Sequence, residues 1–283
     1  MILMHDKHTL EKMEEIIPGS IIVTGASGSM GKAAVEALAR KGRSVTMACR
    51  NLEKGEAALR DVLAKVPGAA IRLLPLDLGS LRSVRAFAAA VADSAPAGLL
   101  NNAGTMPPRF SLTEDGLEQT VAVNYAGPYL LTRLLLDSFA PGASIVNVIS
   151  LTARYARIDR GLLEKGPEDF HQLRTYAASK LALMLFSIEL AKRTSLRVNM
   201  SDPGIVNSNM IDLGRWFDPL ADALFKPLCK RPEQGIAPAI SALESPQTMK
   251  LFKRDKCLDI PARFLDNPLA GYLWEETARR TGL

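Results

Sequence analysis

Residues 21–31 read Ile-Ile-Val-Thr-Gly-Ala-Ser-Gly-Ser-Met-Gly, a short β-branched run that leads directly into a glycine-rich turn. A continuous apolar run of this kind is typical of a strand buried on both faces of a parallel sheet. Small residues in the turn allow close approach of a phosphate, and a helix beginning there offers free N–H groups and a positive dipole. Glycine also serves any tight turn, so it is the position after the first strand that makes the segment indicate nucleotide binding.

The alternation of strand and helix continues outward from this segment. Further strands are expected at 44–49, at 71–76, ending at Leu100, at 144–149, at 196–200 and near Leu251. Helices are expected at about 30–40, around 59–66, at 81–91, at 113–136, at 176–193 and near 236–243. Strands separated by helices need crossover connections, which favour a parallel sheet. The sequence therefore predicts an N-terminal extension over 1–17. It is followed over 18–283 by one doubly wound Rossmann-type α/β domain, with a central, mostly parallel sheet flanked by helices.

Composition excludes several classes of protein. Hydrophobic residues make up 47% of the chain and charged residues 23%, the balance of a packed globular protein. The net charge is +5, without a basic stripe and aromatic platforms, so no nucleic-acid partner is expected. Cys49, Cys229 and Cys257 show neither a disulfide framework nor a metal-ligand spacing, which favours a reducing cytoplasm and no metal. No secretory signal is visible, and the apolar stretch 181–190 is too short for a transmembrane segment.

The end of the second strand bears on the choice of cofactor. Ligands of doubly wound sheets bind at the carboxyl ends of the strands, where an NAD site carries an acid for the ribose and an NADP site an arginine for the 2′-phosphate. Here the strand ends Cys49-Arg50-Asn51, with no acid. The pattern favours NADP(H). The alternative is that Arg50 is an ordinary surface residue.

Tyr176 and Lys180 lie four residues apart at the start of an apolar helix, and therefore on one helix face. A free tyrosine has a pKa near 10, and a nearby ammonium together with an oxidised nicotinamide lowers that pKa. Such a pair is a usable general acid/base. Taken alone, this spacing is common and usually marks nothing more than a helix face.

Together these motifs resemble the short-chain dehydrogenase/reductase family over about residues 20–208. The resemblance rests on the turn 24–31, on Asn101-Asn102-Ala103-Gly104 after the fourth strand, and on Tyr176-Ala177-Ala178-Ser179-Lys180. The long interval between Ser150 and Tyr176 resembles the retinol dehydrogenase and protochlorophyllide reductase branch. Ser29 departs from the family by standing where its middle glycine lies. We expect the neighbouring Gly28 to absorb the unusual backbone angles.

The resemblance implies hydride transfer between NADP(H) and a carbonyl or alcohol substrate. Tyr176 is then the proton donor, Ser150 binds the substrate oxygen, Lys180 holds the nicotinamide ribose, and Asn124 anchors a proton relay. A kinked helix position is the alternative for Asn124, and a helix-capping turn is the alternative for Asp77. The implied cofactor-binding residues are Gly25, Ser27, Ser29, Met30, Gly31, Arg50, Asn51, Asp77, Leu78, Asn102, Ala103, Gly104, Tyr176, Lys180, Pro203, Gly204, Val206 and Ser208.

Several alternatives stay open at the level of sequence. A non-catalytic nucleotide-binding regulatory or scaffold protein of the same fold would tolerate Ser29, whereas a lyase or epimerase using bound NAD would need an acid after the second strand. Residues 205–235 are either a substrate lid or ordinary core. The apolar helices 119–136 and 176–193 either pair across the axis of a homodimer, as in the family, or are buried within the subunit. An apolar substrate is expected, but its identity is not predicted.

Overall fold

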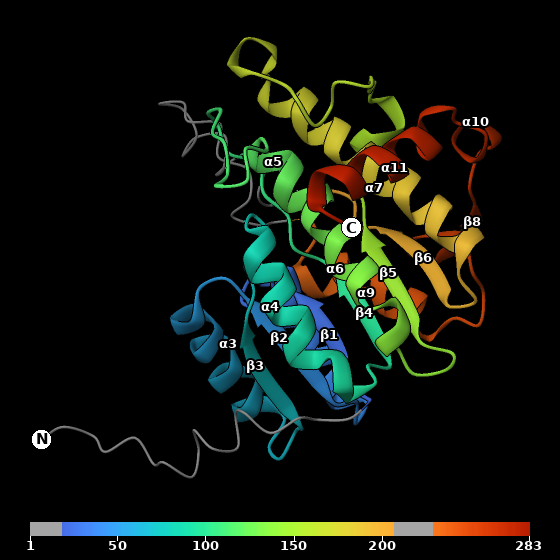
Figure 1. Cartoon of the computed structure of the whole chain (residues 1–283). Helices are drawn as coiled ribbons and strands as arrows, with labels where there is room; N and C mark the ends of the chain where they lie inside the picture. Colours follow the sequence, from blue (N-terminus) through green and yellow to red (C-terminus); the bar gives the residue numbers. More distant parts are fainter. Residues whose placement is uncertain (1–18, 207–228) are drawn as a thin grey trace, which may run out of the picture.

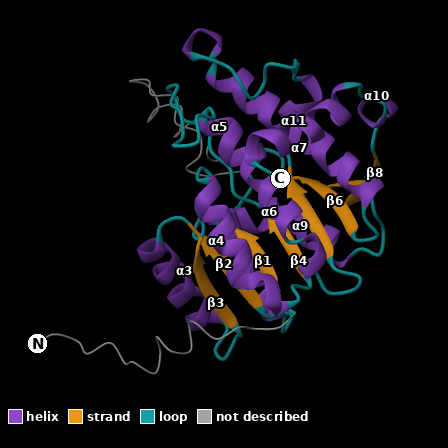
Figure 2. Cartoon of the chain, viewed as in Figure 1, coloured by secondary structure: helices purple, strands orange, loops and turns teal. Residues whose placement is uncertain are grey.

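The computed structural model describes residues 19–206 and 229–283. One eight-stranded sheet organises them, in the order β3-β2-β1-β4-β5-β6-β7-β8 (Figure 2). The strands are β1 (Ile21–Thr24), β2 (Val45–Cys49), β3 (Ile71–Pro75), β4 (Gly98–Asn101), β5 (Ser144–Val148), β6 (Arg197–Asp202), β7 (Lys250–Lys253) and β8 (Lys256–Asp259). All neighbours pair in parallel except β7 and β8. The predicted doubly wound α/β fold is confirmed.

Helices cover both faces of the sheet (Figure 1). One layer holds α2 (Ser29–Arg40), α3 (Leu52–Lys65) and α9 (Pro232–Glu244); the other holds α4 (Leu81–Val91), α5 (Gln119–Val121), α6 (Gly127–Leu134) and α7 (Gln172–Arg193). Successive strand residues point to opposite faces, so Ile22 packs with the α4 layer and Val23 with the α2 layer. Both faces of β1 are therefore buried, which explains its uninterrupted apolar sequence.

Several shorter helical segments connect these elements. They are η1 (Ala92–Ser94), the π-helical segment η2 (Ala122–Ala126), η3 (Leu136–Ser138), η4 (Leu151–Tyr155), η5 (Pro167–Asp169) and α10 (Ala262–Leu265). Within 19–206 and 229–283, no helix has the length and apolarity needed to span a membrane.

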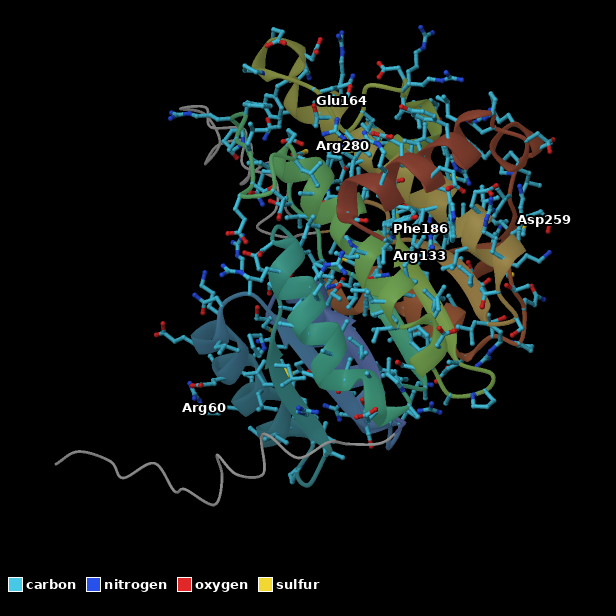
Figure 3. The ribbon with its side chains drawn as sticks, viewed as in Figure 1. Arg60, Arg133, Glu164, Phe186, Asp259 and Arg280 are labelled. Atoms are coloured by element: carbon cyan, nitrogen blue, oxygen red, sulfur yellow. The ribbon has the colours of Figure 1, made fainter. Side chains whose placement is uncertain are left out.

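A C-terminal helix, α11 (Leu269–Thr281), lies over α6 and α7 (Figure 1). Trp274 stacks on Phe186 with ring centroids 5.8 Å apart, and the Tyr129 hydroxyl donates to the Trp274 carbonyl at 2.7 Å. The Arg133 guanidinium lies 4.2 Å from the Trp274 ring centroid, and Figure 3 shows Arg133 and Phe186 close together beneath this helix. Part of the apolar surface of α6 and α7 is therefore buried within the subunit. The homodimer stays a prediction.

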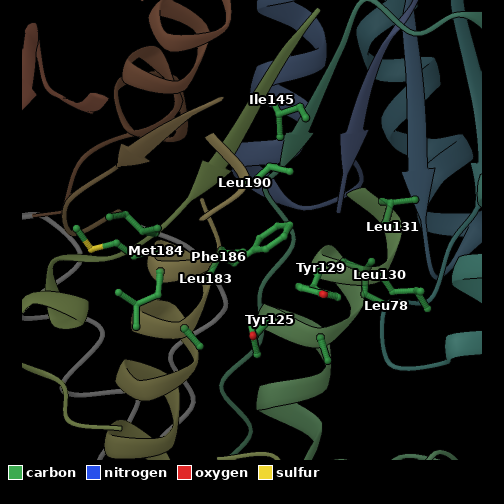
Figure 4. Close-up of a cluster of buried hydrophobic side chains, with 14 of the residues drawn as sticks. Leu78, Tyr125, Tyr129, Leu130, Leu131, Ile145, Leu183, Met184, Phe186 and Leu190 are labelled. Atoms are coloured by element: carbon green, nitrogen blue, oxygen red, sulfur yellow. The ribbon is translucent and has the colours of Figure 1, made fainter. Parts of the chain in front are cut away.

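The core beneath α11 is built from aromatic and aliphatic side chains of α6 and α7. Tyr129 and Phe186 face each other with ring centroids 4.9 Å apart (Figure 4). The Tyr125 hydroxyl, fully buried, lies 2.6 Å from the Thr277 hydroxyl of α11. A buried phenol needs such a partner, so both tyrosines tie α11 to the core through their polar ends.

Several predicted boundaries were wrong; α3 and α9, for example, begin at Leu52 and Pro232, earlier than expected. The helix expected over 113–136 begins only at Gln119, because the Glu118 side chain accepts from the Val121 N–H at 2.8 Å as an N-cap and Leu112 pairs with Glu118 in a β-bridge. α7 begins at Gln172, a turn before the expected Tyr176. β8, α10 and α11 follow Leu251, beyond the last strand that the sequence predicted. The N-terminal extension 1–17 and most of the segment 205–235 lie outside the described residues.

We predict that Trp274→Ala lowers the free energy of unfolding by about 3 to 5 kcal/mol, the usual cost of removing a large buried aromatic ring. The substitution also removes the ring under the guanidinium groups of Arg133 and Arg193. Urea denaturation measures the change. Tyr155→Ala is the control, since Tyr155 is 80% exposed and its loss should change stability by less than about 0.5 kcal/mol. Equal effects of the two substitutions would contradict the packing described for α11.

Candidate active site

The turn between β1 and α2 needs glycine at two positions. Gly25 has a φ of +64°, and a Cβ there would lie 2.9 Å from the Ala103 Cα. A Cβ on Gly31 would lie 2.2 Å from the Gly25 carbonyl oxygen. Gly28 has a φ of −73° and Ser29 is the first residue of α2, so neither adopts a conformation that favours glycine. The expectation that Gly28 absorbs unusual angles was wrong, because Gly25 carries the positive φ of this turn.

The N-terminus of α2 suits an anion. Gly28, at the N-cap, offers no side-chain hydrogen bond to the first turn, and no acidic residue lies in that turn. The first backbone N–H groups of a helix lack partners within the helix, and their partial positive charge favours a phosphate. Glycine at positions 25 and 31 keeps the backbone accessible on this side. These features fit the pyrophosphate of a dinucleotide.

A hydrogen-bonded joint links this turn to the end of β4. The Thr24 hydroxyl accepts from the backbone N–H groups of Asn102 and Ala103, each at 3.0 Å. The Asn102 side-chain amide donates to the Thr24 carbonyl at 2.9 Å. β1 and β4 are the strands at which the strand order reverses, where doubly wound sheets bind their ligands. Asn102, Ala103 and Gly104 therefore border the expected cofactor site.

The ends of β2 and β3 carry the residues expected to contact the adenosine part of the cofactor. Arg50 is exposed at the end of β2. The Asn51 side chain accepts from the Lys54 N–H at 2.8 Å and so caps α3. The Asp77 carboxylate accepts from the Gly79 N–H at 2.8 Å within a turn, whereas Ser80 is the N-cap of α4, so the adenine contact stays a prediction. Leu78 is buried, with its carbonyl oxygen packed close to Gly127.

Ser150 and Tyr176 meet just beyond the carboxyl end of β5. Burial raises the pKa of the Tyr176 hydroxyl above its usual 10, and the hydrogen bond with Ser150 opposes that rise. The Ser150 hydroxyl also accepts from the Thr152 hydroxyl at 3.0 Å. The protein alone therefore does not show the lowered pKa expected for Tyr176. That expectation combined Lys180 with an oxidised nicotinamide, whose positive charge would favour the phenolate when bound.

Lys180 is buried one turn after Tyr176. Its ammonium donates to the Val148 carbonyl at 2.9 Å and lies 6.0 Å from the centroid of the Tyr176 ring. Desolvation lowers its pKa to about 8. The predicted shared helix face of Tyr176 and Lys180 agrees with this geometry, and the lysine remains mostly protonated at neutral pH.

Asn124 holds the loop that follows β4. Its side-chain oxygen accepts from the Thr105 N–H at 2.8 Å, and its amide donates to the Thr105 carbonyl at 2.9 Å and to the Ser179 hydroxyl at 3.0 Å. Asn124 lies in the π-helical segment, where the Gly127 N–H donates to the Ala122 carbonyl. The Asn124 side chain therefore bridges this π-helical position to α7. The proton relay stays a prediction.

The turn after β6 lies at the same edge of the sheet. Gly204 has a φ of +74°, and the Lys230 ammonium donates to the Pro203 carbonyl at 3.0 Å. Val206 pairs with Lys230 in a short β-bridge. Ser208, one of the implied cofactor-binding residues, lies outside the described residues. The remaining predicted positions converge on one edge of the sheet.

A separate open pocket of about 820 Å³ lies between segment 152–169 and the first turns of α7. Leu173, Arg174 and Ala177 contribute to its lining, but none of the predicted catalytic or cofactor-binding residues does. Leu173 lies at helical spacing from Tyr176 and Lys180, so this part of the pocket borders the helix face that carries them. The pocket therefore lies beside the candidate active site, although the predicted catalytic residues do not line it.

Some buried polar residues that hold the elements of the site together were not predicted from the sequence. Asn101 donates to the Asn147 side chain at 2.8 Å, and Asn147 donates to the Ser187 hydroxyl at 2.8 Å. Ser179 both receives the Asn124 amide and donates to the Tyr176 carbonyl at 2.7 Å. A polar residue in the middle of a buried strand, as at Asn147, was a visible signal. The hydrogen-bond partners of Asn147 could not be predicted in the same way, because they depend on which strand and helix lie next to β5.

Comparison with known proteins agrees with this geometry. The family model described as short chain dehydrogenase matches residues 20–215. Human retinol dehydrogenase 13 is 34% identical over 94% of this chain and 86% of its own length. Mouse polyprenol dehydrogenase is 34% identical over 94% of this chain and 84% of its own. A crystal structure of an uncharacterized protein from Mycobacterium paratuberculosis aligns with a TM-score of 0.74 at 28% identity, over 95% of both chains.

The depressed pKa of Lys180 predicts a pH-dependent gain in stability when the charge is removed. Because the folded state disfavours the charged lysine, its cost is fully present below about pH 8 and fades as the pH rises to the unfolded value of 10.5. Lys180→Met should therefore raise the free energy of unfolding by about 1 to 3 kcal/mol at pH 7. Denaturant titrations at several pH values measure this gain, which should shrink between pH 8 and pH 10.5.

The matched control is Lys54→Met on the exposed side of α3. Its stability relative to the parent protein should not vary with pH in this range. A gain for Lys180→Met that stays constant from pH 7 to pH 10.5 would show that the buried ammonium is not the source of the effect.

Proposed function

Because the chain belongs to the short-chain dehydrogenase family, we propose that it is an NADP(H)-dependent oxidoreductase that interconverts a carbonyl and an alcohol. One observation carries the proposal: Ser150 is hydrogen-bonded to Tyr176, and Lys180 is buried one turn further along the same helix. The three groups lie at the edge of the sheet that also holds the glycine turn. This favours an enzyme over a non-catalytic nucleotide-binding protein of the same fold.

Each catalytic side chain has a separate task in this proposal. A bound nicotinamide would supply or accept the hydride. The Ser150 hydroxyl donates to the substrate oxygen and orients it. Tyr176 delivers a proton to that oxygen during reduction and removes it during oxidation. The Lys180 ammonium favours the phenolate form of Tyr176 when the positive nicotinamide is present, because a buried positive charge acts through a low dielectric.

The chain's charges favour NADP(H) over NAD(H). Gly25, Gly31 and the first turn of α2 would hold the pyrophosphate. The exposed Arg50 guanidinium follows β2, and neither Cys49 nor Asn51 beside it is acidic. A guanidinium can form paired hydrogen bonds with a 2′-phosphate. An acid at this position would instead bind the unmodified ribose.

Exposed apolar side chains next to the catalytic residues support an apolar substrate. Leu151 follows Ser150, Leu173 lies one turn before Tyr176, and Ile205 follows Gly204; they are 38%, 52% and 69% exposed. Apolar groups left in water beside a catalytic centre are suited to an apolar ligand. The relatives named retinol dehydrogenase and polyprenol dehydrogenase make retinal and long-chain alcohols suitable first substrates. A cytoplasmic location is also part of this proposal, and it rests on cysteine spacing alone.

Tyr176→Phe should reduce kcat for retinal reduction by at least about 100-fold, because general acid/base catalysis typically contributes that factor or more. Its Kd for NADPH should change less than about threefold. Absorbance at 340 nm follows turnover, and fluorescence follows NADPH binding. Tyr155→Phe is the control, since Tyr155 is exposed. NADPH binding by the parent protein without turnover of any apolar carbonyl would favour the non-catalytic alternative.

Arg50→Ser should weaken NADPH binding by about 10- to 100-fold, the range expected when a charged hydrogen bond to phosphate is lost. Binding of NADH should change little, because NADH lacks the 2′-phosphate. Fluorescence titration with both cofactors measures the two Kd values. Arg60→Ser on α3 serves as an exposed-arginine control. Equal losses for both cofactors would refute the role given to Arg50.

A further inference from the structure

Asp202 is a buried carboxylate beside the catalytic residues. It ends β6 and is 2% exposed. In the parallel pairing of β5 with β6, Val148 lies opposite Ser201, and the Ile149 N–H donates to the Ser201 carbonyl at 2.9 Å. Asp202 therefore lies alongside Ile149 and close to Ser150. It also immediately precedes the Pro203-Gly204 turn.

A lysine from the next strand neutralises this carboxylate. Lys253 of β7 lies directly opposite Asp202, and its ammonium is 2.8 Å from the second carboxylate oxygen. The other oxygen accepts from the Gly204 N–H at 2.9 Å. This second oxygen has no hydrogen-bond partner among the described residues, so charge attraction holds the contact with Lys253. Lys230 adds a hydrogen bond to the Pro203 carbonyl, so two lysines meet at this turn.

The pairing of β5 with β6 places the ion pair near Ser150, and Ser150 is hydrogen-bonded to Tyr176. Groups from several elements face this tyrosine: Lys180 from its own helix, Ser150 from the end of β5, and Asp202 from the end of β6, which Lys253 of β7 offsets. Burial is the main cause that raises the pKa of Tyr176, and the negative charge of Asp202 adds a smaller rise in the same direction. Burying the Asp202 carboxylate costs desolvation energy, which the contact with the partly buried Lys253 ammonium offsets.

We propose that Asp202 and Lys253 form a positioning pair that sets the pH at which Tyr176 exchanges its proton and holds the Pro203-Gly204 turn in place. This inference rests on the proposed function, since it concerns the same general acid/base. Neither residue contacts the reacting atoms. Asp202 acts on Tyr176 through its charge, and Lys253 acts by neutralising most of that charge.

The two halves of the pair predict opposite effects. Removing the carboxylate charge lowers the pKa of Tyr176, whereas removing the ammonium leaves Asp202 uncompensated and raises it. Removing both restores nearly the original balance. In Asp202→Asn the side-chain oxygen still accepts from the Gly204 N–H, so the turn keeps its hydrogen bond. In Lys253→Gln the substituted side chain is only partly buried, which favours correct folding.

The test is the pH dependence of kcat/KM for oxidation of retinol by NADP⁺. Activity should rise with pH as Tyr176 loses its proton. The midpoint should move down by about 0.5 to 1 pH unit in Asp202→Asn and up by about 0.5 pH unit in Lys253→Gln. The double variant should return to within about 0.3 pH unit of the parent. Lys250→Gln is the matched control: Lys250 forms an ion pair with Asp259 at the other end of β7 and should leave the midpoint unchanged.

A second readout does not need turnover. The tyrosinate absorbance of each protein minus that of its Tyr176→Phe counterpart reports ionisation of Tyr176, and stopped-flow pH jumps allow the measurement before alkaline unfolding. The same opposite shifts are expected there. Shifts in one direction for both single variants, or no shift in either, would overturn the inference. Absence of turnover in the parent protein would overturn the proposed function instead, and the tyrosinate titration would still decide on the ion pair.

Discussion

The Thr24 hydroxyl joins the carboxyl ends of β1 and β4, and the rest of the site depends on this joint. It accepts two backbone N–H groups of the loop after β4, while the Asn102 amide returns a hydrogen bond to the Thr24 carbonyl. The two segments approach so closely that a Cβ on Gly25 would collide with Ala103. The glycine-rich turn after β1 and the loop after β4 are thereby fixed to each other at the reversal of strand order.

Buried polar contacts also fix the position of α7, the helix that carries Tyr176 and Lys180. The side chain of Asn147 on β5 receives a hydrogen bond from Asn101 of β4 and donates one to Ser187 of α7. Asn124 clamps the backbone of Thr105 and reaches Ser179 beside Tyr176. An unpaired buried polar group costs about 1 to 3 kcal/mol, so these contacts penalise any displacement of α7 from the sheet. The positions of Tyr176 and Lys180 are therefore fixed by hydrogen bonds that tie α7 to the sheet.

Much of this arrangement was predictable because buried parallel strands are apolar on both faces and polar where they end. The residues after β1, β4 and β5 could be placed at one edge for that reason alone. Asp202 was different: its partner Lys253 is fixed by the register of β6 on β7, which spacing along the chain does not give. The angles of Gly28 were mispredicted because the positive φ of the turn falls at Gly25.

The C-terminal region shows a second limit. β8 is an edge strand with three of its four residues exposed, so it lacks the apolar run that identifies the inner strands. The apolar positions of α11 include Leu273 and Trp274, but one helix face does not show which helices it covers. The aromatic contacts with Tyr129 and Phe186 come from segments far apart in sequence.

The most direct test of the account is the fate of the hydride. The protein would be incubated with retinal and NADPH deuterated at nicotinamide C4, using each C4 epimer in turn, and the retinol would be analysed by mass spectrometry and proton NMR. We predict that one epimer delivers a single deuterium to the carbinol carbon of the product, with none lost to solvent. Oxidation of NADPH with deuterium absent from that carbon in both reactions would contradict direct hydride transfer to the carbonyl.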